Sequence, residues 1–201
     1  MGGLFQSADP EQAHGETLSA RDLLSRGVER IRDALQDQPG ARAVLLGAMG
    51  QAHRGLGMYE ESLPLLDEAA RLADAGGDAS TRHAAQLQRA ESLHALARFR
   101  EELALLEGLV PAGETPATAL RLQRADIDLR RGLASQALNQ LDAAAQAYEA
   151  AHATNRELLG DDDWRTQEVA LKQVSLLSLR ARHKEALPVA RATLAAVMAC
   201  V

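Results

Sequence analysis

The first residues in this chain that could do chemistry are two glycines. Gly55 and Gly57 flank a leucine, and such a loop could let a phosphate approach the backbone. A dinucleotide-binding fingerprint needs a third glycine and a preceding strand, and a Walker loop needs Gly-Lys-Ser/Thr. Neither pattern occurs around these glycines. We therefore interpret them as the end of one helix and the tight turn before the next, and we expect no bound cofactor.

The histidines and the acidic run 161–163 are the candidate metal ligands of the sequence. His83 and His94 lie eleven residues apart, so a helix would separate them by about 16 Å at about 1.5 Å per residue. Asp161, Asp162 and Asp163 offer oxygen ligands but lack the twelve-residue pattern of a calcium loop. They suit N-capping of a following helix better. We therefore expect no bound metal.

No pair of residues in the sequence suggests a nucleophile with its base. Cys200 is the single cysteine, which excludes an internal disulfide, and no basic partner lies near it. The N-terminus lacks the pattern of a signal peptide, and the longest apolar run, 194–201, is too short to span a bilayer. We predict a non-catalytic, cytoplasmic protein without membrane association.

The composition indicates which elements must hold these residues. Hydrophobic residues make up 46% of the 201 residues, but aromatic residues make up only 2%. Alanine and leucine dominate, and both favour helices. The chain carries 22 basic and 28 acidic residues, for a formal charge of −6, so it would repel a nucleic-acid backbone. We predict an all-α protein that does not bind nucleic acid.

Helix signals recur along the whole chain. Ser19 and Asp22 have the spacing of a capping box, and the helix that they open should end near 38–40. No segment shows the two-residue alternation of a strand. Further helices are predicted over 41–54, 59–73, 79–96, 99–110, 117–139, 142–158, 164–181 and 184–199.

The sequence also repeats itself. Four segments align: 58–72, 98–110, 140–152 and 182–194. One alignment column holds Tyr59, Phe99, Leu141 and His183, in steps of 40, 42 and 42 residues. Pro64 and Pro188 share a second column, and we expect them to cost little because they lie near a helix start. A period of this length indicates a repeat array.

At these positions the sequence resembles the tetratricopeptide repeat. The first unit supplies Leu46, Met49, Gly50, His53, Gly57, Tyr59, Ser62, Leu66 and Ala69. The third unit supplies Gly132, Leu141, Ala144, Tyr148 and Ala151, while the second and fourth are degenerate. The period near 42 and the link at 156–171 are similar to the longer kinesin-light-chain type of repeat. The resemblance implies an α-solenoid of antiparallel helix pairs, that is, a tetratricopeptide-like superhelix.

The proposed division follows from this register. Residues 1–40 form an N-terminal helical segment, and residues 41–201 form four repeats, at about 41–77, 78–113, 114–160 and 161–201. Small residues such as Gly50 and Ala69 should let the two helices of a repeat approach to about 8–10 Å. Leu46, Leu66 and Tyr59 should fill the space between repeats, and Trp164 is expected in that core.

In tetratricopeptide arrays the first helix of each repeat lines a concave groove. By position this partner-binding surface should include Gln51, Arg54, Gln88, Glu91, His94, Asp126, Arg130, Lys172 and Ser175. The same residues also fit a solvated helix face. The clamp that captures acidic C-terminal tails in chaperone-binding relatives needs Lys and Asn where this chain has Gly47 and Gln51, so we do not expect that activity.

Residues 5–31 carry a second resemblance, to the segment that follows the kinase domain in bacterial eukaryotic-like serine/threonine kinases with tetratricopeptide repeats. It implies a regulatory C-terminal region, although no kinase motif is present here. The leading hypothesis is a protein- or peptide-binding scaffold. The alternatives are that kinase-associated role and the sensing module of a repeat-bearing transcription regulator. The apolar final helix, with Leu194, Val197, Met198 and Val201, would pair with a second copy or with downstream sequence.

Overall fold

The computed structural model describes residues 19–109 and 118–199, the last four of these by backbone alone. Within those ranges the regular elements are all helices, which confirms the all-α prediction. Their bounds are α1 (Ala20–Ala34), α2 (Pro39–Gly55), α3 (Tyr59–Ala75), α4 (Ala79–Ala95), α5 (Phe99–Gly108), α6 (Thr118–Ala137), α7 (Leu141–Leu159), α8 (Trp164–Leu179) and α9 (His183–Ala199).

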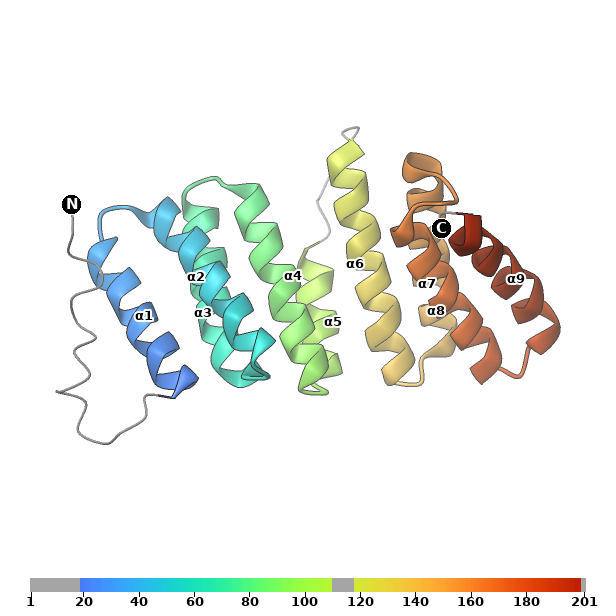
Figure 1. Cartoon of the computed structure of the whole chain (residues 1–201), viewed down its shortest axis with the longest axis horizontal. Coiled ribbons are helices and arrows are strands. Elements are labelled where there is room, and N and C mark those ends of the chain that lie inside the picture. The colour runs from blue at the N-terminus through green and yellow to red at the C-terminus, as the bar shows by residue number, and fades with distance from the viewer. Residues whose placement is uncertain (1–18, 110–117, 200–201) are drawn as a thin grey trace.

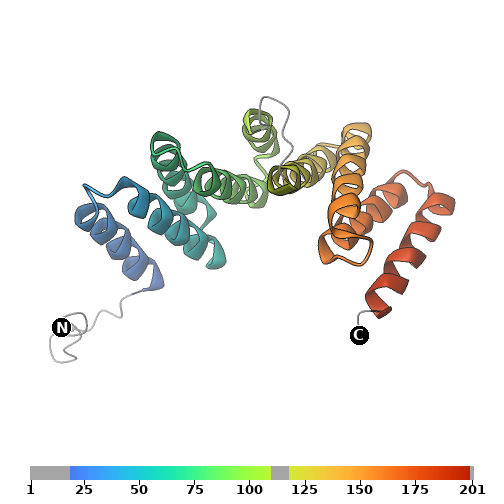
Figure 2. The ribbon, with the colours of Figure 1, turned by 90° about the horizontal axis from the view of Figure 1, so that it is seen from above.

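Consecutive helices lie side by side in one row (Figure 1), and from above the row bends into an arc (Figure 2). Alternate helices also touch, α2 with α4 and α4 with α6. Such contacts are made where the array is tightest, on the inner side of the bend, whereas α5 lies on the outer side in Figure 2. The molecule is therefore a curved α-solenoid, as predicted.

The helices begin where local sequence caps them. Ser19 accepts from the backbone N–H of Asp22 while the Asp22 carboxylate accepts from the Ser19 N–H, which confirms the capping box. Asp163 accepts from the Arg165 N–H at the start of α8, as expected. Pro39, predicted at the end of the first helix, instead opens α2, because a proline in a helix's first turn loses no intrahelical bond.

One tight turn joins the two helices of each pair. A left-handed residue lies two positions before each of α3, α5, α7 and α9: Gly57, Ala97, Asn139 and Ala181, with φ of 74°, 56°, 59° and 56°. The N–H that follows it donates to the carbonyl five residues back, at 2.8–2.9 Å. This is the Schellman end of a helix, and it confirms the turn predicted at Gly57. Gly55 belongs to α2.

Two of these turns use alanine where glycine is unstrained. A left-handed L-residue costs about 1–2 kcal/mol, partly offset by the extra unfolded-state freedom of glycine. We expect Ala97→Gly to raise the free energy of unfolding by about 0.5–1 kcal/mol. Ala84→Gly, on the exposed side of α4, should lower it by about 1 kcal/mol. Urea titration of both variants tests this; the same sign for both would contradict the assigned turn geometry.

Small residues at the helix crossings have the close packing that we expected. A Cβ on Gly50 would lie 2.6 Å from Leu66 Cδ2, and one on Gly132 would lie 2.3 Å from Tyr148 Cε1. Ala69 and Leu46 are fully buried beside the first crossing. Only glycine therefore lets α2 reach α3, and α6 reach α7, at these points.

Two packing expectations are wrong. Trp164 is 69% exposed, because it is the first residue of α8 and its ring lies beside the Arg165 guanidinium, 5.9 Å from it, rather than between repeats. Pro64 and Pro188 occupy the sixth position of α3 and α9, beyond the first turn, so each removes one intrahelical hydrogen bond. The recurrence of proline at this position is therefore not explained by the unpaired N–H groups of a helix's first turn.

The core of the described chain is a row of small clusters. One joins α1 to α4 around Leu46 and Ala69, one joins α4 to α6 around Leu106 and Ile127, and one joins α6 to α8 around Tyr148. Each repeat therefore packs mainly on its neighbours, as in other solenoids.

Candidate functional site

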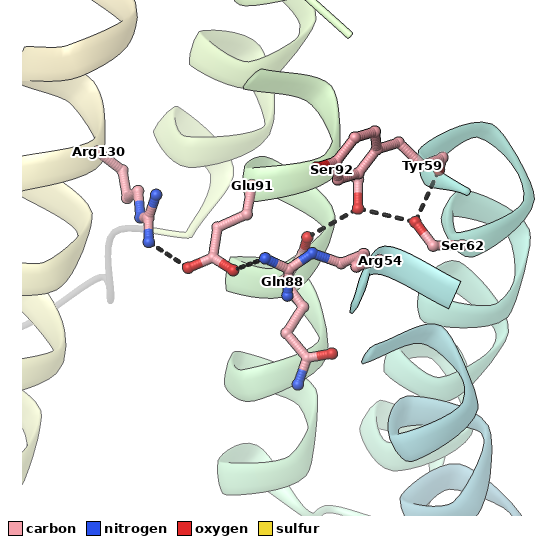
Figure 3. Close-up of polar contacts among 7 residues, drawn as sticks. All are labelled: Arg54, Tyr59, Ser62, Gln88, Glu91, Ser92 and Arg130. Carbon is pink, nitrogen blue, oxygen red and sulfur yellow. Dashed lines mark hydrogen bonds and ion pairs between the residues drawn. The ribbon is translucent and has the colours of Figure 1, made fainter. Parts of the chain in front are cut away.

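One carboxylate links three helices of the array (Figure 3). Arg54 of α2 donates from Nη2 to Glu91 Oε2, and Arg130 of α6 donates from Nη2 to Glu91 Oε1. The side chains of Arg54, Glu91 and Arg130 are 20%, 25% and 29% exposed. Charged donors and acceptors in this half-buried setting form stronger hydrogen bonds than neutral ones. The structure thus brings together three of the residues predicted for the groove.

Buried hydroxyls fix the central helix behind this network. Ser62 Oγ of α3 and Ser92 Oγ of α4 lie 2.8 Å apart, and neither residue is exposed. Ser62 donates to the Tyr59 carbonyl, and Ser92 bonds to the Gln88 carbonyl at 3.2 Å (Figure 3). Gln88 Oε1 is buried without a hydrogen-bond partner in the described structure. The hydrogen bond between Ser62 and Ser92 sets the position of α4, and therefore of Glu91, relative to α3.

His94, also predicted for the groove, instead bonds to and packs against residues of the neighbouring helix α5. Its Nδ1 lies 2.9 Å from Glu102 Oε2, and its ring meets the Phe99 ring edge-on at 5.1 Å between centroids. Glu102 is fully buried, and its other oxygen has no partner among the described residues. Burial raises the pKa of the Glu102 carboxyl, and the His94 hydrogen bond only partly opposes this rise.

This raised pKa gives the chain a measurable pH dependence. The folded state binds the Glu102 proton more tightly than the unfolded chain, whose carboxyl titrates near 4.5, so ionisation weakens folding. Relative to Glu102→Gln, the wild type should lose stability as the pH rises above about 4.5. Urea unfolding of both proteins across this range provides the measurement. A difference that does not change with pH would show that Glu102 titrates normally.

The remaining predicted residues are not drawn into this network. Asp126 of α6 is half-buried, and burial raises the pKa of its carboxyl against the opposing charges of Arg165 and Arg130. Gln51 and Ser175 are exposed, and Lys172 is half-buried. Asp126 lies four residues before Arg130 on α6, and no ion pair joins the two side chains in the described structure.

The sequence did not indicate the cavities near the C-terminal end. One of about 700 Å³ lies among α7, α8 and α9, beside His152, Asp162, Gln167 and Pro188. A second, of about 300 Å³, lies between the same helices around Leu176 and Val189. Small alanine side chains on α8 and α9 line the larger cavity. The cavity depends on how three helices are placed relative to one another, so no signal for it is present in the sequence. Burial lowers the pKa of His152, so its imidazole tends to be neutral there.

Within residues 19–109 and 118–199 no group of three histidine, cysteine or acidic side chains could hold a metal ion. In the same part of the chain no helix combines the length and the hydropathy that are needed to cross a bilayer.

Solved structures with this architecture include a tetratricopeptide-like array. MamA from Desulfovibrio magneticus RS-1 aligns over 89% of this chain and 88% of its own, with 16% sequence identity and a TM-score of 0.64. A putative kinesin light chain from Podosopora anserina, with nearly identical TPR-like repeats, aligns over 88% of both chains, with 16% identity and a TM-score of 0.62. No protein-family model and no curated protein matches the sequence. The fold is that of a tetratricopeptide-like solenoid.

Proposed function

We propose that this chain is a non-catalytic protein-interaction scaffold that binds a peptide or partner segment on the inner side of its arc. The observation that carries the proposal is the ionic network of Arg54, Glu91 and Arg130, which joins three neighbouring inner helices and remains partly open to solvent. Side chains from successive helices that lie together in this way offer an extended ligand one polar contact per repeat. The fold shared with tetratricopeptide-like proteins supports this use.

The proposed binding surface consists of the residues predicted from the sequence. The ionic network would form its centre, with Gln51 on α2 and with Lys172 and Ser175 on α8. His94 would contribute only an edge of its ring, because its Nδ1 is bonded to Glu102.

A site-specific photo-crosslinker tests which face binds. Placed at Ser175 on α8, it should label a partner in cell extract; placed at Ala104, an exposed residue of α5 on the outer side of the arc, it should not. Arg130→Glu should reduce the Ser175 product at least tenfold while circular dichroism stays unchanged. Labelling from Ala104 that is insensitive to Arg130→Glu would show that the outer face binds instead.

Finer features remain part of the proposal. We propose the division into residues 1–40 and four repeats, of which the boundary at 113–114 lies outside the described residues. A regulatory role beside a serine/threonine kinase rests on residues 5–31, of which 5–18 also lie outside them, and the sequence upstream of residue 1 tests it. A cytoplasmic location is likewise proposed.

Self-association through α9 is a further proposal. Leu187 and Leu194 are exposed on this helix, whereas the side chains of Val197, Met198 and Val201 lie outside the described part. Light scattering over a wide concentration range tests it: a constant monomer mass would contradict self-pairing.

A further inference from the structure

The centre of the proposed surface has the composition of a carboxylate-binding site that is already occupied. Two guanidinium groups converge on the single carboxylate of Glu91, one from α2 and one from α6. Each guanidinium carries five N–H donors in a planar fork, an arrangement that matches carboxylate oxygens. The anion in this site is supplied by the chain itself.

This occupied site can be reached from solvent. The three side chains are each at least one-fifth exposed, so an incoming anion could approach without disruption of the core. Asp126, four residues before Arg130 on α6, is a second acidic group on the same side of the helix. An acidic segment in this place would therefore face Glu91 and Asp126 while both nearby arginines are already paired, and like charges at close range are unfavourable.

We propose that Glu91 is a specificity-determining residue that excludes acidic segments from the inner face, so that the native partner presents an uncharged segment at this point. Removal of the Glu91 charge converts the site into a receptor for a carboxylate. The inference rests on the proposed function, because it names the chemistry of the partner that the same surface accepts.

The chain contains a matched control for this idea. Glu68 of α3 also lies between two arginines, at 2.6 Å from Arg32 of α1 and 3.9 Å from Arg42 of α2. Its side chain has a similar exposure to solvent, but only Arg32 lies within hydrogen-bond distance of Glu68, and the pair lies outside the proposed surface. Glu68→Gln therefore removes the same charge from a place where two guanidinium groups do not converge on one carboxylate.

The test measures fluorescence anisotropy with a labelled peptide of alternating glutamate and alanine, and with its glutamine analogue. Glu91→Gln should bind the acidic peptide at least tenfold more tightly than wild type does. It should bind the glutamine analogue with the same affinity as wild type does. Glu68→Gln should behave as wild type. The double variant Glu91→Gln/Arg130→Gln should bind the acidic peptide no more tightly than wild type does. Salt at 0.5 M should weaken the binding of the acidic peptide by Glu91→Gln.

Several results would overturn the inference. Equal binding of the acidic peptide by wild type and Glu91→Gln would show that Glu91 does not compete. An equal gain in Glu68→Gln would assign the effect to net charge. If Glu91→Gln fails to fold, Glu91→Ser, which removes the same charge with a smaller side chain, should still show the gain, and no gain would refute the proposal. Photo-crosslinking from Ser175 in wild type, with no gain in either variant, would leave the scaffold function intact and reject only this inference.

Discussion

Replacement of Tyr148 by alanine is expected to lower the free energy of unfolding by about 3–5 kcal/mol, the range found when a buried aromatic side chain is truncated. Tyr148 is the largest fully buried side chain of the described structure and lies at the centre of the cluster that joins α6, α7 and α8. Its hydroxyl donates to Gln136 Oε1 at 3.0 Å, and burial raises its pKa to about 12. A loss of this size is a large part of a typical stability of about 5–15 kcal/mol.

Urea unfolding followed by circular dichroism measures this loss, and two controls separate its causes. Tyr148→Phe removes only the hydrogen bond to Gln136 and should cost about 1 kcal/mol. Glu149→Ala, an exposed neighbour on α7, should stay within about 0.5 kcal/mol of wild type. If Tyr148→Ala cost no more than Tyr148→Phe, the ring would not be part of a packed core.

The second large effect concerns the glycine that faces this ring. Gly132→Ala should cost about 1–3 kcal/mol, because the new methyl would lie 2.3 Å from Cε1 of the fully buried Tyr148 ring. In a Tyr148→Ala background the same change should reverse sign. There the collision is gone, and alanine exceeds glycine in helix propensity by about 1 kcal/mol.

A double-mutant cycle of Gly132→Ala and Tyr148→Ala measures this coupling directly. Gly47→Ala is the control, because Gly47 lies within α2 and an added Cβ would meet nothing within 4 Å. This change should stabilise the protein by about 1 kcal/mol. If Gly132→Ala behaved as Gly47→Ala does, the close approach of α6 and α7 would be wrong.

The sequence predicted this architecture well because a repeat supplies several independent signals for one unit. The column of Tyr59, Phe99, Leu141 and His183 was found by alignment, and each of these residues begins a helix. The packing role of Gly50 also followed from its position in the repeat pattern. Trp164 was misplaced because hydrophobicity alone does not tell whether the first residue of a helix points inward or outward.

The candidate site was less predictable, because its contacts depend on side chains from separate repeats. Position alone put Arg54, Glu91 and Arg130 on the same surface, and their spacing of nearly one repeat was visible in the sequence. That one carboxylate joins both arginines depends on the curvature that brings α2, α4 and α6 together. His94 was assigned to the groove because nothing in the sequence indicated its pairing with Glu102 eight residues later.

The three separate core clusters have a consequence for how the molecule opens. Because most contacts are between neighbouring helices, the part around Tyr148 can lose its structure while the part around Leu46 keeps it. Amide hydrogen exchange should then show a graded pattern along the chain instead of a single opening. A bound segment that touches α2, α4 and α6 at once would tie these openings together, so that occupancy would appear as slower exchange in helices that the ligand never contacts.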